Sequence, residues 1–272
     1  YGDLDRIRDA FVRFLSSVPF YGAGIVCLDD ANVRRVLPRV DRKLITYGLS
    51  SDAEVVATDV DVSGFVSRFN VHVAGPKLGR VELPLPGRHA VYNGLAAVAV
   101  GLELDVPFRT IAAALKRFRG VDRRLQLRGE ARGAMVIDDY GHHPTEIAAT
   151  LAAVREGFGA RTVVLFQPHR YTRTRDLLEE FGGAFVLADH VIVTDVYPAG
   201  EAPIEGVNGE RVADALVRHG HPSVEYEPNP RKLAGRARRT LHEGEILLTL
   251  GAGDIWKVGD ALVRAESRRK KR

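Results

Sequence analysis

Two polar segments in the second half of the chain hold the residue types best suited to chemistry. They are Asp138–Glu146 and Gln167–Arg175, and together they contain three histidines and three arginines. Each follows an apolar run typical of a buried strand, and each leads into a helical pattern. Because ligands bind at the carboxyl ends of strands in open α/β sheets, the two segments predict a site for an anionic ligand.

The first segment places acidic and imidazole groups at the start of a predicted helix. Asp138 and Asp139 end the strand, and Pro144 fits the first helical turn. His142 and His143 then lie at the helix amino terminus, where free N–H groups favour an anion. The alternative is a capped loop whose polar side chains only satisfy backbone groups.

The second segment gathers cationic side chains at a strand exit. Arg170, Arg173 and Arg175 follow His169, and Gln167 anchors the turn. Arginine is the preferred bidentate partner of carboxylates and phosphates. We therefore interpret the cluster as a carboxylate-capturing site, the alternative being a solvated basic loop.

Three weaker patterns lie outside these segments. His89 and Asn93 stand one turn apart at a predicted helix start, where they could face a nucleotide base or merely cap the helix. Arg123 and Arg124 lie in a polar stretch, residues 120–129, that we interpret as a basic linker able to close over a nucleotide, or as simply solvated. The turn Gly251-Ala252-Gly253-Asp254 could serve packing alone.

The order of elements predicts two α/β domains. The first half mixes helices with strands, including an alternating region from 54 to 85 typical of antiparallel strands. The second half alternates strictly between strand and helix, which predicts a Rossmann-like, mainly parallel doubly wound sheet. Its predicted strands are 134–137, 163–166, 191–193, 224–226 and 246–250.

Composition is that of a globular protein, with 45% hydrophobic and 27% charged residues among 272 and a formal charge of +4. No apolar run approaches the ~20 residues of a membrane span, so we expect no membrane partner. We expect no nucleic-acid partner either, because the terminal basic run 268–272 lacks interleaved aromatics and is predicted to be a solvated tail. The single Cys27 fits a reducing cytoplasm, where we expect the protein to be located.

Several motifs of other enzyme classes are missing from the sequence. It contains no Gly-x-x-x-x-Gly-Lys-Ser/Thr phosphate loop, no Cys/His zinc spacing and no Gly-x-Ser-x-Gly nucleophile elbow. The chain also opens at Tyr1 directly into an amphipathic helical pattern, and we expect it to be truncated.

Taken together, the motifs resemble the Mur ligase family of peptidoglycan synthesis, in particular its members that attach L-alanine to UDP-N-acetylmuramate. The resemblance extends to the start of the basic tail. The segments that carry it are Pro86–His89 with Asn93, Asp122–Arg124, Asp138–Glu146, Phe166–Arg175, Tyr197–Ile204 and Gly251–Ile255.

The resemblance implies a domain organisation and a reaction. Residues 1–128 would be the latter part of a central ATP-binding domain, 129–265 a carboxyl-terminal amino-acid-binding domain, and 266–272 a basic tail. The family reaction uses ATP and Mg²⁺ to convert the muramyl carboxylate to an acyl phosphate, which the amine of L-alanine attacks. It serves cell wall formation, and with it cell shape and division.

The resemblance also implies what this chain lacks. The UDP-binding domain, the phosphate loop and the main magnesium ligands would lie on a missing preceding part. No metal ligand is expected among the present residues, and we expect the fragment to be inactive alone.

The resemblance assigns roles residue by residue. His89 and Asn93 would face adenine, although Ala90 replaces an asparagine found beside adenine in some members. Arg124 and His142 would be catalytic, with Arg124 at the phosphates. The other implied contacts are Asp139 and Tyr140 for the nucleotide, and Tyr140, His142, His169, Arg170 and Arg173 for the substrates.

Two other functions stay open at this point. A metal-dependent phosphohydrolase could bind two metals through Asp138, Asp139, His142, His143 and His169. A non-catalytic ligand-binding fragment is the third possibility. The oligomeric state is not predicted.

Overall fold

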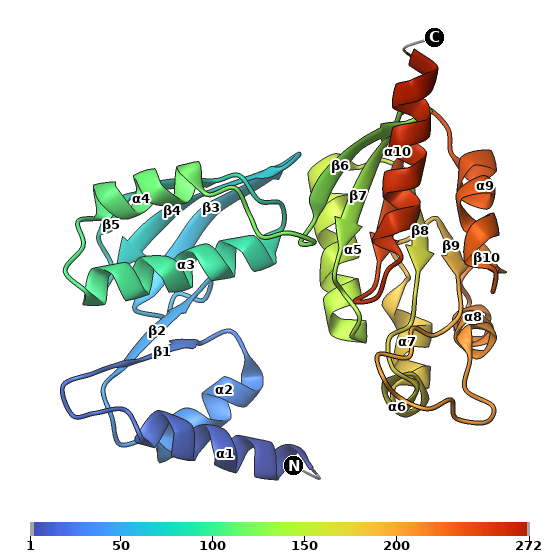
Figure 1. Ribbon diagram of the computed structural model, residues 1–272. Helices are drawn as coiled ribbons and strands as arrows, with labels where there is room; N and C mark the ends of the chain where they lie inside the picture. The colour runs from blue at the N-terminus through green and yellow to red at the C-terminus, as the bar shows by residue number, and fades with distance from the viewer. Residues whose placement is uncertain (1–2, 271–272) are drawn as a thin grey trace. The chain divides into compact units, whose positions relative to one another are not determined.

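The computed structural model describes residues 3–270, without the side chain of Lys270, and divides into two compact units, Tyr1–Arg119 and Gly120–Arg272. Each unit is described by itself below (Figure 1). The expectation of a truncation rests on Tyr1, which lies outside the described residues.

Unit 1 is a five-stranded mixed sheet covered by two helices. Its sheet order is β1-β2-β3-β4-β5; the β1–β2 and β2–β3 pairs are parallel, and the β3–β4 and β4–β5 pairs are antiparallel. The antiparallel part confirms the prediction from the alternating region 54–85. The elements are α1 Leu4–Ser16, β1 Gly24–Cys27, α2 Ala31–Val36, the short 3₁₀ helix η1 Leu37–Arg39, β2 Leu44–Gly48, β3 Val55–Ser63, β4 Val66–Val73, β5 Lys77–Leu83, α3 Arg88–Glu103 and α4 Phe108–Arg117.

The core of unit 1 lies between this sheet and helices α3 and α4. Phe69 and Val81 of the sheet and Leu95 of α3 are fully buried. Gly94 lets the helix approach, because a Cβ there would lie 3.1 Å from the Phe69 ring. Tight packing of this kind fixes the orientation of α3, which carries two of the predicted nucleotide-binding residues.

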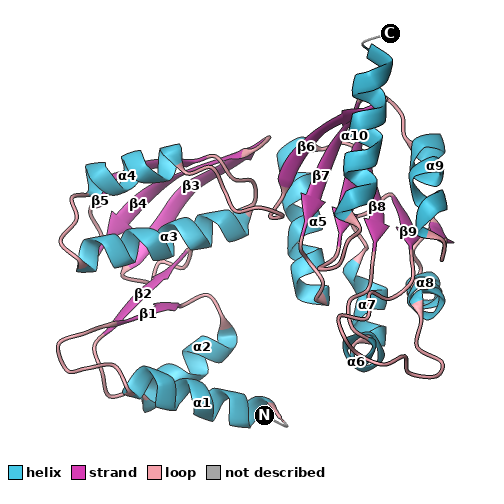
Figure 2. Cartoon of the chain, in the orientation of Figure 1, coloured by secondary structure: helices cyan, strands magenta, loops and turns pink. Residues whose placement is uncertain are grey.

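Unit 2 is a six-stranded sheet in the order β10-β9-β8-β11-β7-β6, parallel except for the edge strand β6. Figure 2 labels four of its strands, β6 to β9, and the helices around them. Helices α5, α7 and α8 pack along one face, and α9 and α10 along the other. The elements are β6 Gln126–Ala131, β7 Ala134–Asp139, α5 Pro144–Phe158, β8 Thr162–Phe166, α6 Tyr171–Asp176, α7 Leu178–Ala184, β9 His190–Val193, α8 Gly209–Arg218, β10 Val224–Tyr226, α9 Pro230–Thr240, β11 Ile246–Leu250 and α10 Trp256–Lys270.

The topology confirms the predicted doubly wound α/β fold. Strands β7 to β10 proceed toward one edge of the sheet, and β11 returns to lie between β7 and β8. The central strands β8 and β11 are buried at every position, which is why each reads as an unbroken apolar run.

Two expectations at the ends of unit 2 were wrong. The stretch 120–129 is not wholly a linker, because β6 begins at Gln126 and pairs antiparallel with β7. Residues 266–270 do not form a solvated tail beyond the last helix, because α10 continues to Lys270. Glu266 is buried on it and lies 3.8 Å from Arg269, an ion pair one turn apart that supports the helix. The last two tail residues, 271 and 272, lie outside the described residues.

Candidate functional site

The predicted site residues of unit 2 lie in loops that leave neighbouring parallel strands. Strands β7, β11, β8 and β9 are adjacent, and their carboxyl ends meet at one edge of the sheet. The loop after β7 carries Tyr140 and His142, and the loop after β8 carries His169 and Arg170. The fold therefore brings together the two polar segments that the sequence singled out.

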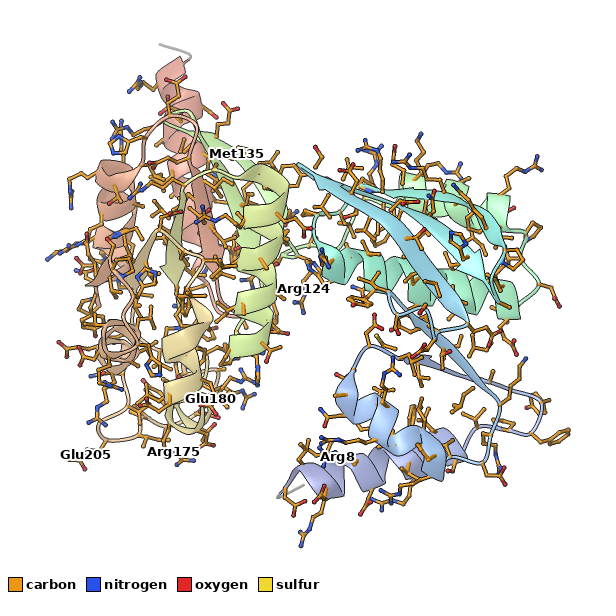
Figure 3. All side chains as sticks on the ribbon, turned by 180° about the vertical axis from the view of Figure 1, so that it is seen from behind. Arg8, Arg124, Met135, Arg175, Glu180 and Glu205 are labelled. Carbon is orange, nitrogen blue, oxygen red and sulfur yellow. The ribbon has the colours of Figure 1, made fainter. Side chains whose placement is uncertain are left out.

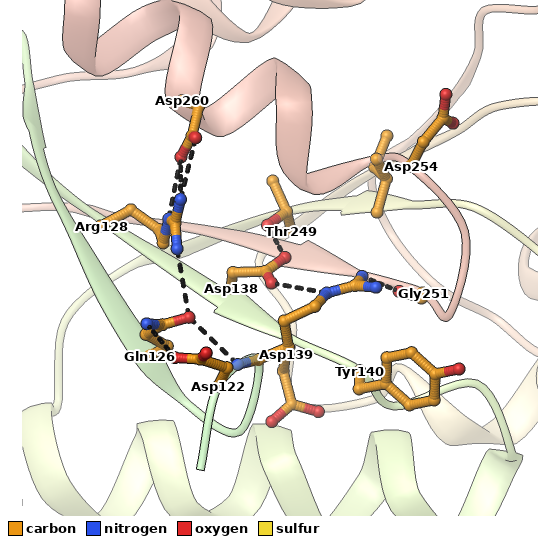
Figure 4. A network of polar contacts seen from close by, with 12 residues as sticks. Asp122, Gln126, Arg128, Asp138, Asp139, Tyr140, Thr249, Gly251, Asp254 and Asp260 are labelled. Carbon is orange, nitrogen blue, oxygen red and sulfur yellow. Dashed lines mark hydrogen bonds and ion pairs between the residues drawn. The ribbon is translucent and has the colours of Figure 1, made fainter. Parts of the chain in front are cut away.

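A buried ion pair holds the segment before β6, the start of unit 2, against the carboxyl ends of these strands. The Arg123 Nε donates to Asp138 Oδ2 at 3.0 Å, and its Nη2 donates to the Gly251 carbonyl at 2.5 Å (Figure 4). The other Asp138 oxygen accepts from Thr249 Oγ1 at 2.6 Å. Because the Asp138 carboxylate is fully buried, this pairing is what makes its charge tolerable. Arg123 is thus fixed to the sheet and does not act as a free hinge residue.

Asp139 points to the opposite face of the sheet from Asp138, as successive strand residues do. It is 2% exposed, and its oxygens accept from the N–H groups of Leu125 and Gly141, both at 2.8 Å, and from Thr150 Oγ1 at 3.2 Å. Burial raises the pKa of this carboxyl against the lowering effect of those hydrogen bonds. We expected Asp139 to contact the nucleotide. Within this chain its contacts hold the two loops around it, and a contact with the nucleotide stays a prediction.

The start of α5 uses the two histidines differently. His143 is the N-cap, accepting the Thr145 N–H at Nδ1, while Glu146 Oε2 accepts the N–H groups of His142 and His143. The capping alternative therefore applies to His143. The His142 Nδ1 lies 3.0 Å from the Tyr140 carbonyl, which can only accept. That contact places a proton on Nδ1 and leaves Nε2 as the acceptor of a neutral ring.

Tyr140 lies against two guanidinium groups. The Arg123 guanidinium carbon is 4.8 Å from the Tyr140 ring centroid, and that of Arg124 is 5.8 Å away. Arg124 is half exposed, and its Nη1 is 3.8 Å from Glu146 Oε1. It therefore presents a cation that is only loosely paired, and its contact with phosphate stays a prediction.

His169 is held between an arginine and an aromatic ring. The Arg173 Nη1 donates to His169 Nδ1 at 3.2 Å, so the neutral ring carries its proton on Nε2. The ring stacks on Tyr197, with centroids 5.7 Å apart and planes 7° apart, and its centroid lies 5.7 Å from that of His142. Burial, followed by the positive charge of Arg173, lowers the His169 pKa to about 4. The site thus keeps His169 neutral near pH 7.

Arg170 and Arg175 have different surroundings. Arg170 Nη1 lies 3.3 Å from Glu201 Oε1, and the Arg170 N–H donates to the Tyr197 carbonyl. Arg175 pairs with its neighbour Asp176 at 2.7 Å, and Figure 3 shows it at the outer end of the unit, away from Arg124. Of these three arginines, Arg170 and Arg173 lie at the histidine cluster, and their binding of a substrate stays a prediction.

The glycine turn after β11 forms a tight joint with Gln167. The Gln167 Oε1 accepts the N–H groups of Asp254 and Ile255 at 2.9 and 3.1 Å. A Cβ on Gly253 would lie 2.6 Å from Tyr197 Cγ, and one on Gly251 would lie 2.7 Å from the Gln167 carbonyl oxygen. The two glycines are therefore needed for close approach, as the packing interpretation proposed.

The remaining predicted site residues lie in unit 1. His89 and Asn93 are both exposed and occupy the first two turns of α3 on one helical face. Between them, the hydroxyl of Tyr92 donates to Asp29 Oδ2 at 3.0 Å. Burial, followed by this hydrogen bond, raises the Tyr92 pKa to about 12. The adenine contacts of His89 and Asn93 stay a prediction.

Sequence reasoning missed the roles of Arg123, Glu201 and Thr150. Arg123 was visible only as half of a basic pair, and its partner lies 15 residues away. Glu201 stood in a quoted segment, but nothing in its spacing indicated a contact with Arg170. Thr150 is a helix-face threonine, and no sequence signal distinguishes it from a surface one.

The side-chain arrangement counts against the metal-dependent phosphohydrolase. Asp138 and Asp139 face opposite sides of the sheet, and their oxygens are engaged in hydrogen bonds. Within residues 3–270, no group of three or more His, Cys, Asp or Glu side chains is arranged to hold a metal ion. The residues present therefore do not fit a magnesium site.

None of the helices that the structure describes is long and apolar enough to cross a membrane.

Comparison with known proteins identifies both units. The profile of the Mur ligase middle domain matches residues 1–101, and that of the Mur ligase glutamate ligase domain matches residues 123–253. The chain therefore consists of Mur ligase middle and carboxyl-terminal domains and belongs to the Mur ligase family.

Two curated proteins similar in sequence to this chain share one name. The UDP-N-acetylmuramate–L-alanine ligase of Geobacter sp. (strain M21) is 52% identical over 264 residues, covering 97% of this chain and 57% of that protein. The ligase of the same name from Geobacter sulfurreducens is 47% identical, covering 96% and 57%. The chain thus spans about 57% of the length of the curated relatives it matches.

Solved structures agree with this placement. The Thermotoga maritima UDP-N-acetylmuramate-alanine ligase MurC superposes with a TM-score of 0.78 at 26% identity, covering 98% of this chain and 56% of that one. The Thermotoga maritima MurF ligase, solved in complex with ADP, has a TM-score of 0.75 at 18% identity, covers 98% and 59%, and shows the common fold alone.

Proposed function

We propose that this chain provides the latter part of the ATP-binding domain and the amino-acid-binding domain of a UDP-N-acetylmuramate–L-alanine ligase. In this reaction ATP phosphorylates the muramyl carboxylate, and the amine of L-alanine displaces phosphate to form the amide. The protein would act in the cytoplasm in peptidoglycan synthesis. The observation that carries the proposal is the cluster of His142, His169, Arg170 and Arg173 at one sheet edge, in a chain 52% identical to a ligase of that name.

The cluster suits a small zwitterion. Arg170 and Arg173 can bind the alanine carboxylate, because guanidinium groups pair with carboxylates through two parallel N–H bonds. His169 stays neutral beside them and adds no further charge, since its pKa is lowered to about 4. The alanine amine is then left free to attack.

We assign to His142 the role of taking a proton from that amine. Its Nδ1 is committed to the Tyr140 carbonyl at 3.0 Å, which fixes the ring and leaves Nε2 to accept. Its ring lies 5.7 Å from that of His169, so it borders the proposed alanine site. Arg124, half exposed nearby, would face the phosphoryl groups of ATP, and Asn93 and His89 of unit 1 the adenine.

The proposed magnesium ion has no ligand set among the described residues of this chain. We place its binding on the part of the relatives that this chain does not match, and we assign no residue here to it.

The test is a chimera in which this chain replaces the matched 264 residues of the Geobacter sp. (strain M21) ligase. We expect ADP release that requires both UDP-N-acetylmuramate and L-alanine. Arg173→Ala should raise the KM for L-alanine far more than Arg218→Met, which alters an exposed pair with Glu179 elsewhere in the unit. A folded chimera that binds ATP but releases ADP equally without L-alanine would refute the proposal.

A non-catalytic ligand-binding role is the second candidate, because the exposed Arg170 guanidinium could bind a carboxylate without any chemistry following. It predicts that the 272-residue chain alone binds L-alanine without releasing ADP from ATP and UDP-N-acetylmuramate. L-Alanine-dependent ADP release by the chain alone would exclude it.

A further inference from the structure

Glu201 is a fixed carboxylate beside the proposed amino-acid site. It lies in the loop that follows β9, and its side chain is only 19% exposed. The carboxylate accepts the Thr172 N–H at 3.0 Å and the Thr172 hydroxyl at 2.7 Å. These two hydrogen bonds, the N–H bond first, hold the Glu201 pKa below its ordinary value, so the group is charged near pH 7. Its position is therefore set by the first turn of α6.

Arg170 depends on the same loop for both its backbone and its side chain. Its φ of +72° is a left-handed conformation that residues other than glycine rarely adopt. Its N–H donates to the Tyr197 carbonyl at 2.9 Å, and its Nη1 lies 3.3 Å from Glu201 Oε1. No side-chain bond caps α6 at this residue. The backbone of Arg170 is thus fixed by this loop and by α6, where the N–H and hydroxyl of Thr174 donate to its carbonyl, and the guanidinium contacts Glu201 of the loop after β9.

The contact between the two groups leaves Arg170 available to a ligand. A guanidinium has five N–H donors in a rigid fork, and Glu201 engages one end of it. The Arg170 side chain is 47% exposed, so the rest of the fork is open to solvent. Arg173 has a different support, because it donates to the ring and the carbonyl of His169. The two arginines of the cluster are thus held by separate partners.

We propose that Glu201 is a positioning residue, which holds the Arg170 guanidinium in the orientation that binds the carboxylate of the incoming amino acid. This inference rests on the proposed function for the identity of the ligand. It assigns to Glu201 no contact with substrate. Its effect on amino-acid affinity must therefore pass through Arg170.

Binding of carboxyl-¹³C-labelled L-alanine to the 272-residue chain, followed by NMR, measures that effect. Glu201→Gln keeps the shape of the side chain and an acceptor for Thr172 but removes the charge. We expect it to weaken binding roughly threefold to fivefold, as loss of a partly exposed ion pair does. Glu179→Gln, which removes the charge of an exposed pair with Arg218, is the matched control and should leave affinity unchanged.

A double-mutant cycle separates positioning from a general structural effect. If Glu201 acts through Arg170, then Glu201→Gln should have no further effect on L-alanine affinity in an Arg170→Ala background. An equal loss in both backgrounds would overturn the inference.

A ligand-independent measurement keeps the inference testable if the chain does not bind L-alanine. Relaxation of the Arg170 ¹⁵Nε reports the order of its guanidinium, with Arg218 as an internal reference. We expect Arg170 to be ordered in the parent chain and mobile in Glu201→Gln. Unchanged relaxation would overturn the positioning role. A loss of order without any L-alanine binding by the parent chain would support the positioning role and count against the proposed function.

Discussion

Replacing Arg123 with methionine tests whether the buried pair with Asp138 holds unit 2 together at its site edge. The change keeps most of the aliphatic stem but leaves the Asp138 carboxylate, 1% exposed, with Thr249 as its remaining side-chain partner. Removing one partner of a buried ion pair costs about 3–5 kcal/mol. Because the Arg123 side chain is itself 22% exposed, we expect about 3 kcal/mol, the lower end of that range.

Urea unfolding followed by the fluorescence of Trp256 measures this cost. The chain has one tryptophan, and it lies in unit 2 at the start of α10, so the signal reports that unit. With a slope near 2 kcal/mol per molar urea, a loss of about 3 kcal/mol lowers the midpoint by about 1.5 M. Arg218→Met breaks an exposed pair in the same unit and should cost under about 1 kcal/mol.

Two results would refute the reasoning. One is a midpoint for Arg123→Met no lower than that for Arg218→Met. The other concerns the double variant Arg123→Met/Asp138→Asn, which removes the stranded charge and should recover part of the lost stability. If it is less stable than Arg123→Met alone, then the pairing of charge is not the source of the cost.

Two further predictions concern the wall of the proposed amino-acid site. The folded-state pKa of His169 is about 4 and its unfolded value is about 6.5, so its stabilising contribution is complete above pH 6.5 and is lost as the pH falls toward 4. Discounted for exposure of the ring, this contribution to the free energy of unfolding amounts to about 1 kcal/mol. His169→Gln should therefore flatten the pH dependence of the urea midpoint between pH 4 and 6.5. His242→Gln, which changes an exposed histidine, is the control and should leave that pH dependence as it is. Gly253→Ala should destabilise unit 2 by about 1–3 kcal/mol and weaken L-alanine binding, because the new Cβ would lie 2.6 Å from Tyr197 Cγ. Gly183→Ala, which meets no neighbouring atom within 4 Å, is its control, and equal urea midpoints and affinities for the two variants would contradict the argument.

The strands of unit 2 that the sequence predicted best are those buried on both faces. Strands β8 and β11 read as apolar runs because every position is covered by helices. Strand β6 was missed because it is an edge strand, where half-exposed Leu127 and polar neighbours need only main-chain pairing with β7. The hydrophobic pattern of a sequence indicates which side chains are buried. A strand held mainly by main-chain hydrogen bonds is therefore hard to predict from that pattern.

For the candidate site too, some features could be predicted from the sequence and others could not. The positions of His142, His169, Arg170 and Arg173 followed from strand ends, which the alternating pattern predicts. The burial of the Asp139 carboxylate could not be predicted from the strand pattern, because it depends on the N–H groups of Leu125 and Gly141, which donate to its oxygens. Contacts between loops are set by tertiary packing, and a single sequence does not encode them in any short spacing.

The place of β11 in the sheet has a consequence for synthesis of the protein. This strand is made after the other strands of unit 2 that the structure describes, yet it lies between β7 and β8, whose loops carry the two histidines of the site. The site edge of unit 2 cannot close until residues 246–250 have left the ribosome. A nascent chain that stops before them carries every arginine and histidine of the cluster and still has no binding site.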